Sequence, residues 1–169
     1  MPFIGIIGKE NDSNFIKNEI IKNSKISNFD VINLNRKNLE NMKNIRFDIV
    51  VINENIEKII KYSNYLEIII KNTKYLLINI DNKIKTPNFG YNEQNIITYG
   101  FNSNSIITIS SIKDDNIMIC VQKRFRGKLK EIEEQEFSVK LQKYNINKLY
   151  NILAIFTILQ INGEILQKI

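Results

Sequence analysis

A short segment near the amino terminus has the residue types of a phosphate-binding turn. The apolar run Ile4 to Ile7 ends at Gly8, and Ser13 follows at the head of a helical pattern. In α/β proteins, a glycine turn between a buried strand and a helix directs backbone N–H groups toward a phosphate. Gly8, Lys9 and Ser13 are therefore candidate nucleotide-binding residues.

The charge of this turn argues against that chemistry. A P-loop requires a lysine directly before its serine or threonine, and Asp12 stands at that position. A contact between unit charges at about 4 Å is worth roughly 4 kcal/mol at an effective dielectric of 20. Replacing a cation with an anion therefore opposes a triphosphate strongly. We expect no cofactor, with ATP and magnesium as the alternative.

A second polar candidate follows an apolar run at 75–80. The tetrapeptide Asn79-Ile80-Asp81-Asn82 ends that run, and open α/β sheets bind ligands at the carboxyl ends of their strands. Asn79 and Asp81 are thus candidate binding residues. A plain turn explains the same residues equally well, because asparagine and aspartate favour turns.

One basic segment contains an aromatic residue and could contact nucleic acid. It runs from Lys123 to Lys130 and includes Phe125, the combination that nucleic-acid surfaces use. Acidic residues follow it closely, at 131, 133, 134 and 136, and would repel phosphates. The pattern favours a solvated hairpin tip, and we do not expect a nucleic-acid partner.

Composition narrows the remaining chemistry. The chain has 169 residues and a net charge of +6, mostly from lysine, and it contains no histidine. Histidine is the side chain most often used in general acid–base catalysis, and the chain lacks it. We therefore assign no catalytic residue and no metal ligand. The single Cys120 lies in an apolar run and is interpreted as a core residue. No apolar run approaches the roughly 20 residues of a membrane span, so we expect a cytoplasmic protein without a membrane partner.

The elements that would position these residues predict an α/β fold in one domain, 1–169. Apolar runs predict parallel strands, amphipathic patterns predict helices, and later alternation predicts antiparallel strands. The parallel part spans 1–100, antiparallel strands occupy 101–145, and a carboxyl-terminal helix occupies 146–169. Parallel strands are predicted at 4–7, 29–34, 47–52, 75–80 and 96–99, antiparallel strands at 105–112, 116–123 and 135–141, and helices after a cap at Asp12 or Ser13, at 55–71 and at 147–161.

Three of these segments, in this order, resemble the central ATP-binding domain of the Mur ligases and of the related folylpolyglutamate and cyanophycin synthetases. They are the glycine turn at 5–13, the strand end at 79–82 followed by Ile97-Thr98-Tyr99-Gly100-Phe101, and the helix Tyr150-Asn151-Ile152-Leu153-Ala154-Ile155. The resemblance covers nearly the whole chain. It implies a P-loop-like parallel sheet flanked by helices, with a small three-stranded antiparallel sheet in the carboxyl-terminal half.

The resemblance also implies roles for single residues. Gly8 and Ser13 keep their types in the family's phosphate loop, whereas Asn11 replaces a glycine and Asp12 the phosphate-binding lysine. Asn151 corresponds to a residue near the adenine, and Asn79 and Asp81 are retained as well. Of the family's magnesium ligands, Glu54 offers at most a displaced glutamate. The family's Asp-His stretch is missing, and neither Lys71 nor Lys74 can be matched to its modified lysine.

These losses make a non-catalytic role the expected one. We expect a degenerate Mur-ligase-like central domain, without the family's amino- and carboxyl-terminal domains, that has a binding or regulatory role linked to cell-wall (peptidoglycan) metabolism. Its partner would be another protein or a second copy of itself. The alternatives are residual ATP- and magnesium-dependent ligation of a carboxylate to an amine, simple nucleotide binding, and nucleic-acid binding through 123–130.

Overall fold

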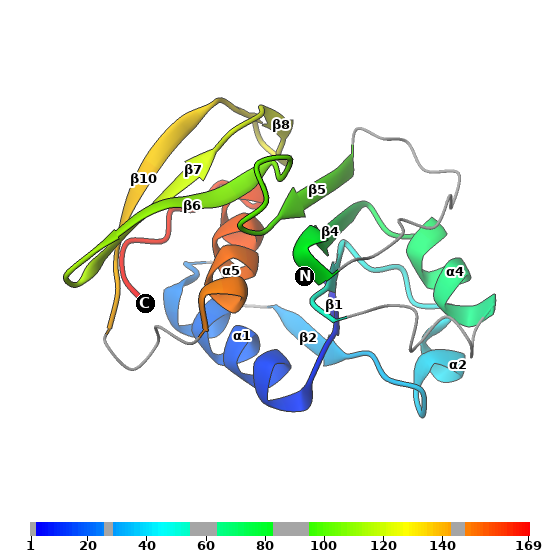
Figure 1. The fold of residues 1–169 in the computed structure, drawn as a ribbon. Coiled ribbons are helices and arrows are strands. Elements are labelled where there is room, and N and C mark those ends of the chain that lie inside the picture. The colour runs from blue at the N-terminus through cyan, green and yellow to red at the C-terminus, as the bar shows by residue number, and fades with distance from the viewer. Residues whose placement is uncertain (1–2, 26–28, 55–63, 83–94, 143–147) are drawn as a thin grey trace.

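The computed structural model describes residues 3–25, 29–54, 64–82, 95–142 and 148–169. Within these ranges the chain forms an eight-stranded sheet with helices on both faces (Figure 1). The strand order is β10-β7-β6-β5-β4-β3-β1-β2. Neighbouring strands from β2 to β6 run parallel, so the predicted α/β class with a mostly parallel sheet is confirmed. The parallel strands begin with β1 (Phe3–Ile7), β2 (Asp30–Asn33), β3 (Ile49–Ile52), β4 (Tyr75–Asn79) and β5 (Ile96–Tyr99).

The antiparallel strands of the second half extend this sheet. They are β6 (Ile107–Lys113), β7 (Asn116–Val121) and β10 (Gln135–Lys140), and β7 runs antiparallel to both of its neighbours. Backbone hydrogen bonds from Ile106 to Thr98 and from Gly100 to Ile107 join β6 to the edge of β5. The three strands were expected as a small sheet of their own, and these bonds are why they continue the main one. The separate small sheet is the hairpin of β8 (Phe125–Arg126) and β9 (Glu131–Ile132).

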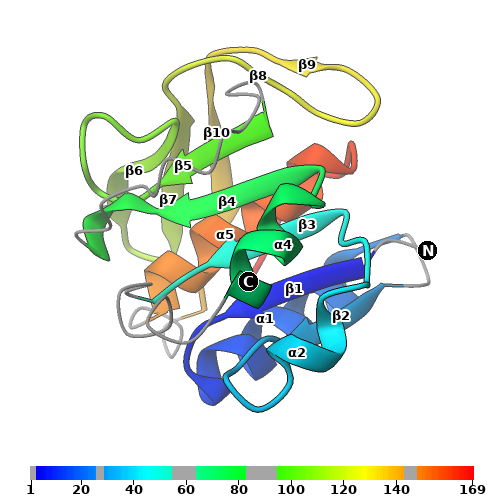
Figure 2. The ribbon, with the colours of Figure 1, turned by 90° about the vertical axis from the view of Figure 1, so that its right-hand side faces the viewer.

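The helices cover opposite faces of the sheet. Helices α1 (Glu10–Asn23) and α5 (Leu149–Ile161) lie on one face, and α2 (Leu39–Met42) and α4 (Asn64–Lys71) lie on the other (Figures 1 and 2). Each strand contributes side chains to the core on both faces of the sheet, because alternate side chains of a strand point to opposite faces. In β3, for example, Ile49 and Val51 join the α1–α5 side of the core, whereas Val50 and Ile52 join the α2–α4 side.

One helix prediction differs from the structure. Helix α1 begins at Glu10, with Lys9 as its cap, because the N–H groups of Asp12 and Ser13 both donate to the Lys9 carbonyl at 3.0 Å. The predicted cap at Asp12 or Ser13 is therefore wrong. The predicted helix at 55–71 is present from 64 to 71, and its part at 55–63 lies outside the described residues. The short α2 was not predicted. No helix in the described ranges is long and apolar enough to cross a membrane.

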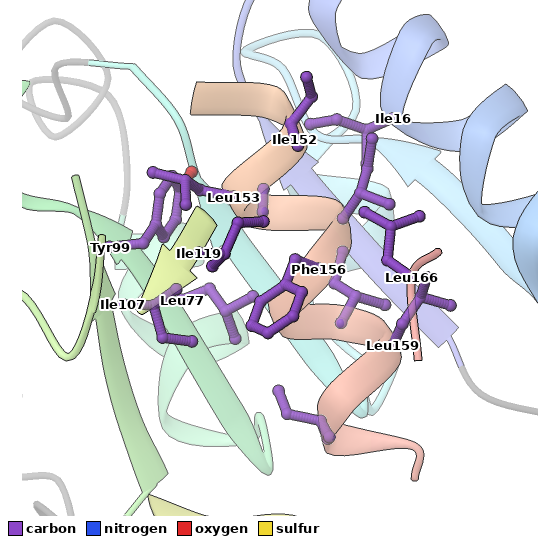
Figure 3. Packing of buried hydrophobic residues seen from close by; sticks show 14 of the residues in the cluster. Ile16, Leu77, Tyr99, Ile107, Ile119, Ile152, Leu153, Phe156, Leu159 and Leu166 are labelled. Atoms are coloured by element: carbon purple, nitrogen blue, oxygen red, sulfur yellow. The ribbon is translucent and has the colours of Figure 1, made fainter. Parts of the chain in front are cut away.

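Helix α5 is enclosed on all sides. Every residue from Asn151 to Ile161 is buried, as expected for a helix that is apolar all round. It packs between α1 and the sheet, and the segment after it adds Leu166 to the same cluster (Figure 3). The ring of Phe156 meets that of Phe137 from β10 edge-on, with centroids 5.1 Å apart. The sheet, α1 and the chain end therefore hold α5 in one place.

Gly100 lies at a point where a side chain would be strained. Its φ is +152°, and a Cβ there would lie 2.7 Å from Oδ2 of Asp81. We predict that Gly100→Ala lowers the free energy of unfolding by about 1–3 kcal/mol, the usual cost of such backbone strain. Gly8→Ala is the control, since a Cβ at Gly8 meets its nearest atom at 3.6 Å. Urea unfolding measures both, and equal stability of the two variants would contradict the prediction.

Candidate functional site

A cavity of about 200 Å³ opens where the carboxyl ends of β1, β3 and β4 meet the first turn of α5. This is the edge at which open parallel sheets bind ligands. The lining side chains are polar apart from the ring of Tyr150. They belong to Lys9, Asp12, Asn53, Glu54, Asn79, Asn82, Lys148, Tyr150 and Asn151.

The turn from β1 to α1 is short. Only Gly8 and Lys9 separate the strand from the helix. In a phosphate-binding turn the N–H groups at the helix start point at the ligand. Here the N–H group of Asp12 already donates to the Lys9 carbonyl, and the N–H group of Ser13 makes the first bond of the helix to the same oxygen. The first turn of α1 also carries two acidic side chains, Glu10 and Asp12, which supply the negative charge that a helix amino terminus favours.

Asp12 is held by two side chains from the start of α5. Its Oδ1 lies 2.8 Å from Nζ of Lys148 and accepts a hydrogen bond from Nδ2 of Asn151 at 2.9 Å. Partial burial acts to raise the pKa of Asp12, but these two hydrogen bonds and the charges of Lys148 and Lys9 outweigh it. The pKa of Asp12 is therefore lowered, and the carboxylate stays ionised beside Lys148.

Asn53, directly after β3, connects the polar side chains of the floor. Its Nδ2 donates to Oδ1 of Asn151 at 2.6 Å, and its Oδ1 accepts from the hydroxyl of Tyr99 at 3.0 Å. Nδ2 of Asn79 approaches the same oxygen at 3.4 Å, and Nδ2 of Asn82 donates to the Asn53 carbonyl at 3.1 Å. The side chain of Asn53 thus contacts residues of β4, β5 and α5, and its partner Tyr99 is fully buried.

The structure brings together only some of the predicted site residues. Lys9, Asn79 and Asn151 line the cavity. Ser13 is 3% exposed, and its hydroxyl donates to Oδ1 of Asn33 at 3.2 Å, so it is engaged by the end of β2. The remaining prediction on this turn, Gly8, contributes backbone between β1 and α1 and is not among the residues that line the cavity.

Asp81 organises backbone and lies outside the cavity lining. Its carboxylate accepts hydrogen bonds from the N–H groups of Phe101 and Asn102, while its own N–H donates to Oδ1 of Asn79. These bonds fasten the loop that follows β5 to the end of β4. The tetrapeptide at 79–82 therefore contributes Asn79 and Asn82 to the cavity and a structural turn, η1 (Ile80–Asn82), beside it.

Two central residues of the site were missed from the sequence. Asn53 follows β3 as Asn79 ends β4, so its place at a strand end was a usable signal. Lys148 had no such signal, because its position depends on how α5 packs. The ionisable lining residues are two lysines and two carboxylates, which leaves the cavity without a net positive charge. Within the described residues, no group of three His, Cys, Asp or Glu side chains could hold a metal ion.

Comparison with known proteins adds no assignment. No model of a protein family matches the chain, and no curated protein is significantly similar to it. The resemblance to Mur ligases therefore stays a prediction from the sequence.

The lowered pKa of Asp12 predicts a pH-dependent contribution to stability. At pH 7 we expect Asp12→Asn to lower the free energy of unfolding by about 1 kcal/mol, because a partly buried ion pair is lost. A lowered pKa stabilises the folded state above the unfolded value of about 3.9, and this contribution disappears as the pH falls through the folded pKa.

Urea unfolding of the wild type and of Asp12→Asn between pH 7 and pH 3 measures the difference between their free energies of unfolding at each pH. Lys148→Gln and the double variant serve as controls, since the double variant should lose little more than either single one. A difference between wild type and Asp12→Asn that stays constant across the pH range would contradict the assignment.

Proposed function

We propose that this chain is a non-catalytic, Mur-ligase-like domain with a binding or regulatory role toward another protein, linked to cell-wall metabolism. The P-loop-like origin of its first turn is part of this proposal. The observation that supports it most is the pairing of Asp12 with Lys148 and Asn151. The anion of this site is part of the chain itself, at the position where the resemblance implies a phosphate-binding lysine.

The electrostatics of the cavity support a role other than triphosphate binding. A nucleoside triphosphate would have to break the Asp12–Lys148 pair or lie beside the Asp12 carboxylate. It would also meet a second carboxylate, that of Glu54, in the cavity lining. Each close like-charge contact costs roughly 4 kcal/mol at an effective dielectric of 20, which is comparable to the binding free energy of a millimolar ligand.

Exposed aromatic side chains at the cavity support a protein partner. Tyr150 lines the cavity and is 37% exposed, and Phe101 is 46% exposed. Their rings meet edge-on, with centroids 4.9 Å apart. Protein interfaces are enriched in aromatic anchors of this kind, which bring a large contact area at little entropic cost. Sedimentation of the purified chain, of 19.9 kDa, distinguishes a second copy from a different protein as the partner.

The alternative function, residual nucleotide binding, has one observation in its favour. Lys9 lines the cavity, and its side chain makes no hydrogen bond or ion pair with any described residue. Asn151, the residue that the resemblance places near an adenine, lies in the same cavity. If nucleotide bound there, the chemistry implied by the resemblance would be formation of an acyl phosphate and then of an amide.

The two functions predict different responses to nucleotide. We expect no change in melting temperature with ATP, ADP or GTP at millimolar concentration in the presence of magnesium, because a ligand that does not bind the folded state cannot stabilise it. Differential scanning fluorimetry measures this. The Lys9→Gln variant is the control, since it removes the charge of Lys9 from the cavity. A rise in melting temperature for the wild type that is lost in Lys9→Gln would favour the alternative.

A further inference from the structure

We propose a second binding site, for a small phosphate-bearing ligand, at the opposite end of the same strands. A cavity of about 390 Å³ lies between the turn that leads into β3 and the turn that leads into β4. Its side chains include Arg46, Lys71 and Lys74, with Asn44 and Asn72 beside them. Asn79 of the first site lies five positions after Lys74 along the chain, a distance of about 16 Å in an extended strand.

The charged side chains among the described residues that line this cavity are all basic. None of the described residues that line it is acidic, whereas three are basic. Lys71 pairs with Glu67 and Lys74 with Asp48, each at 2.6 Å, so carboxylates outside the lining balance these two lysines. Arg46 is exposed and makes no hydrogen bond or ion pair with a described residue. Its guanidinium is therefore available as a bidentate hydrogen-bond donor to an oxyanion.

Three carbonyl groups at the end of helix α4 are engaged in hydrogen bonds. Helix α4 ends at this cavity, and a helix carboxyl terminus normally presents free carbonyl groups with partial negative charge. The N–H groups of Asn72 and Thr73 donate to the carbonyls of Ile68 and Ile70. The Thr73 hydroxyl donates to the carbonyl of Ile69 at 2.7 Å. These bonds reduce the negative partial charge that the end of the helix presents to an anion.

The basic hairpin of β8 and β9 adds to the field at this end of the sheet. Burial acts to raise the pKa of Asp48, but hydrogen bonds from Lys74 and the Phe3 N–H, with the charges of Lys128 and Lys74, lower it overall. Lys128, from the hairpin, is therefore near the same carboxylate. Part of the basic segment seen in the sequence thus lies at this edge, while its Arg124 faces Glu131 within the hairpin at 3.9 Å.

The size and donor set favour a phosphate ester over a nucleic acid. The cavity is larger than a phosphate group alone, so the phosphate would be carried on a larger polar molecule. Single-stranded nucleic acids need exposed aromatic rings on which bases can stack. None of the described residues that line this cavity is aromatic. The site is separate from the one discussed above, so its failure would leave the proposed function untouched.

Titration with inorganic phosphate, followed by amide chemical shifts in NMR spectra at about 0.15 M salt, tests the site. We expect the shifts to cluster at 44–46 and 71–74. Arg46→Gln should weaken binding at least about tenfold, because a charge-assisted pair of hydrogen bonds is lost. Arg46→Lys keeps the charge without the fork and should give an intermediate loss. The charge-matched control Arg124→Gln should bind as the wild type does.

Three results would overturn the proposal. They are shifts spread over exposed lysines across the molecule, equal losses in Arg46→Gln and Arg124→Gln, and tighter binding of a short single-stranded RNA that depends on Arg124. The last result would assign the basic edge to nucleic acid instead. Unchanged melting temperatures of the variants show that a loss of binding is not a loss of folding.

Discussion

The enclosure of α5 is the constraint on which the rest of the structure depends. A helix that is apolar on every side must be covered on every side, and here α1, the sheet and the chain end provide that cover. The packing leaves its first turn at the carboxyl ends of β1, β3 and β4. Lys148 and Asn151 consequently meet Asp12, and Asn151 meets Asn53. The polar network of the site is thus a consequence of apolar packing.

The polar side chains of the site bond to one another. The Asp12 carboxylate accepts from two side chains, and Asn53 uses both ends of its carboxamide. Buried polar groups that are satisfied in this way rigidify a structure, and a ligand at Asp12 or Asn53 would have to replace bonds that already exist. The edge at which open parallel sheets bind ligands is here the place where side chains of α1, β5 and α5 and the residue after β3 are bonded to one another.

The α/β class and most elements were predictable from the sequence because they depend on local patterns. Continuous apolar runs gave the buried parallel strands, and period-two alternation gave β6, β7 and β10. The start of α1 was predicted wrongly, because the helix begins at Glu10, and the N–H groups of Asp12 and Ser13 already donate to the Lys9 carbonyl inside its first turn. Continuation of the sheet through β6 depends on bonds between residues of β5 and β6, which no periodicity reveals.

The candidate site was predictable only in part, for the same reason. Lys9 and Asn79 could be singled out by their places beside strand ends and Asn151 by the resemblance, and all three line the cavity. Ser13 and Asp81 were singled out equally well, yet neither lines the cavity: the Ser13 hydroxyl bonds to Asn33, and the Asp81 carboxylate accepts from the backbone of the loop after β5. Lys148 matters only because α5 is fixed against α1. Chain spacing does not encode such a contact between distant segments.

A crystal structure of the protein grown with millimolar ATP and magnesium tests the central claim most directly, since the claim concerns which group occupies the position beside Asp12. We predict that Nζ of Lys148 and Nδ2 of Asn151 remain bonded to Asp12, with no nucleotide at the turn of Gly8 and Lys9. Phosphate oxygens bound to the N–H groups at the start of α1, with Lys148 turned from Asp12 to the nucleotide, would contradict the account.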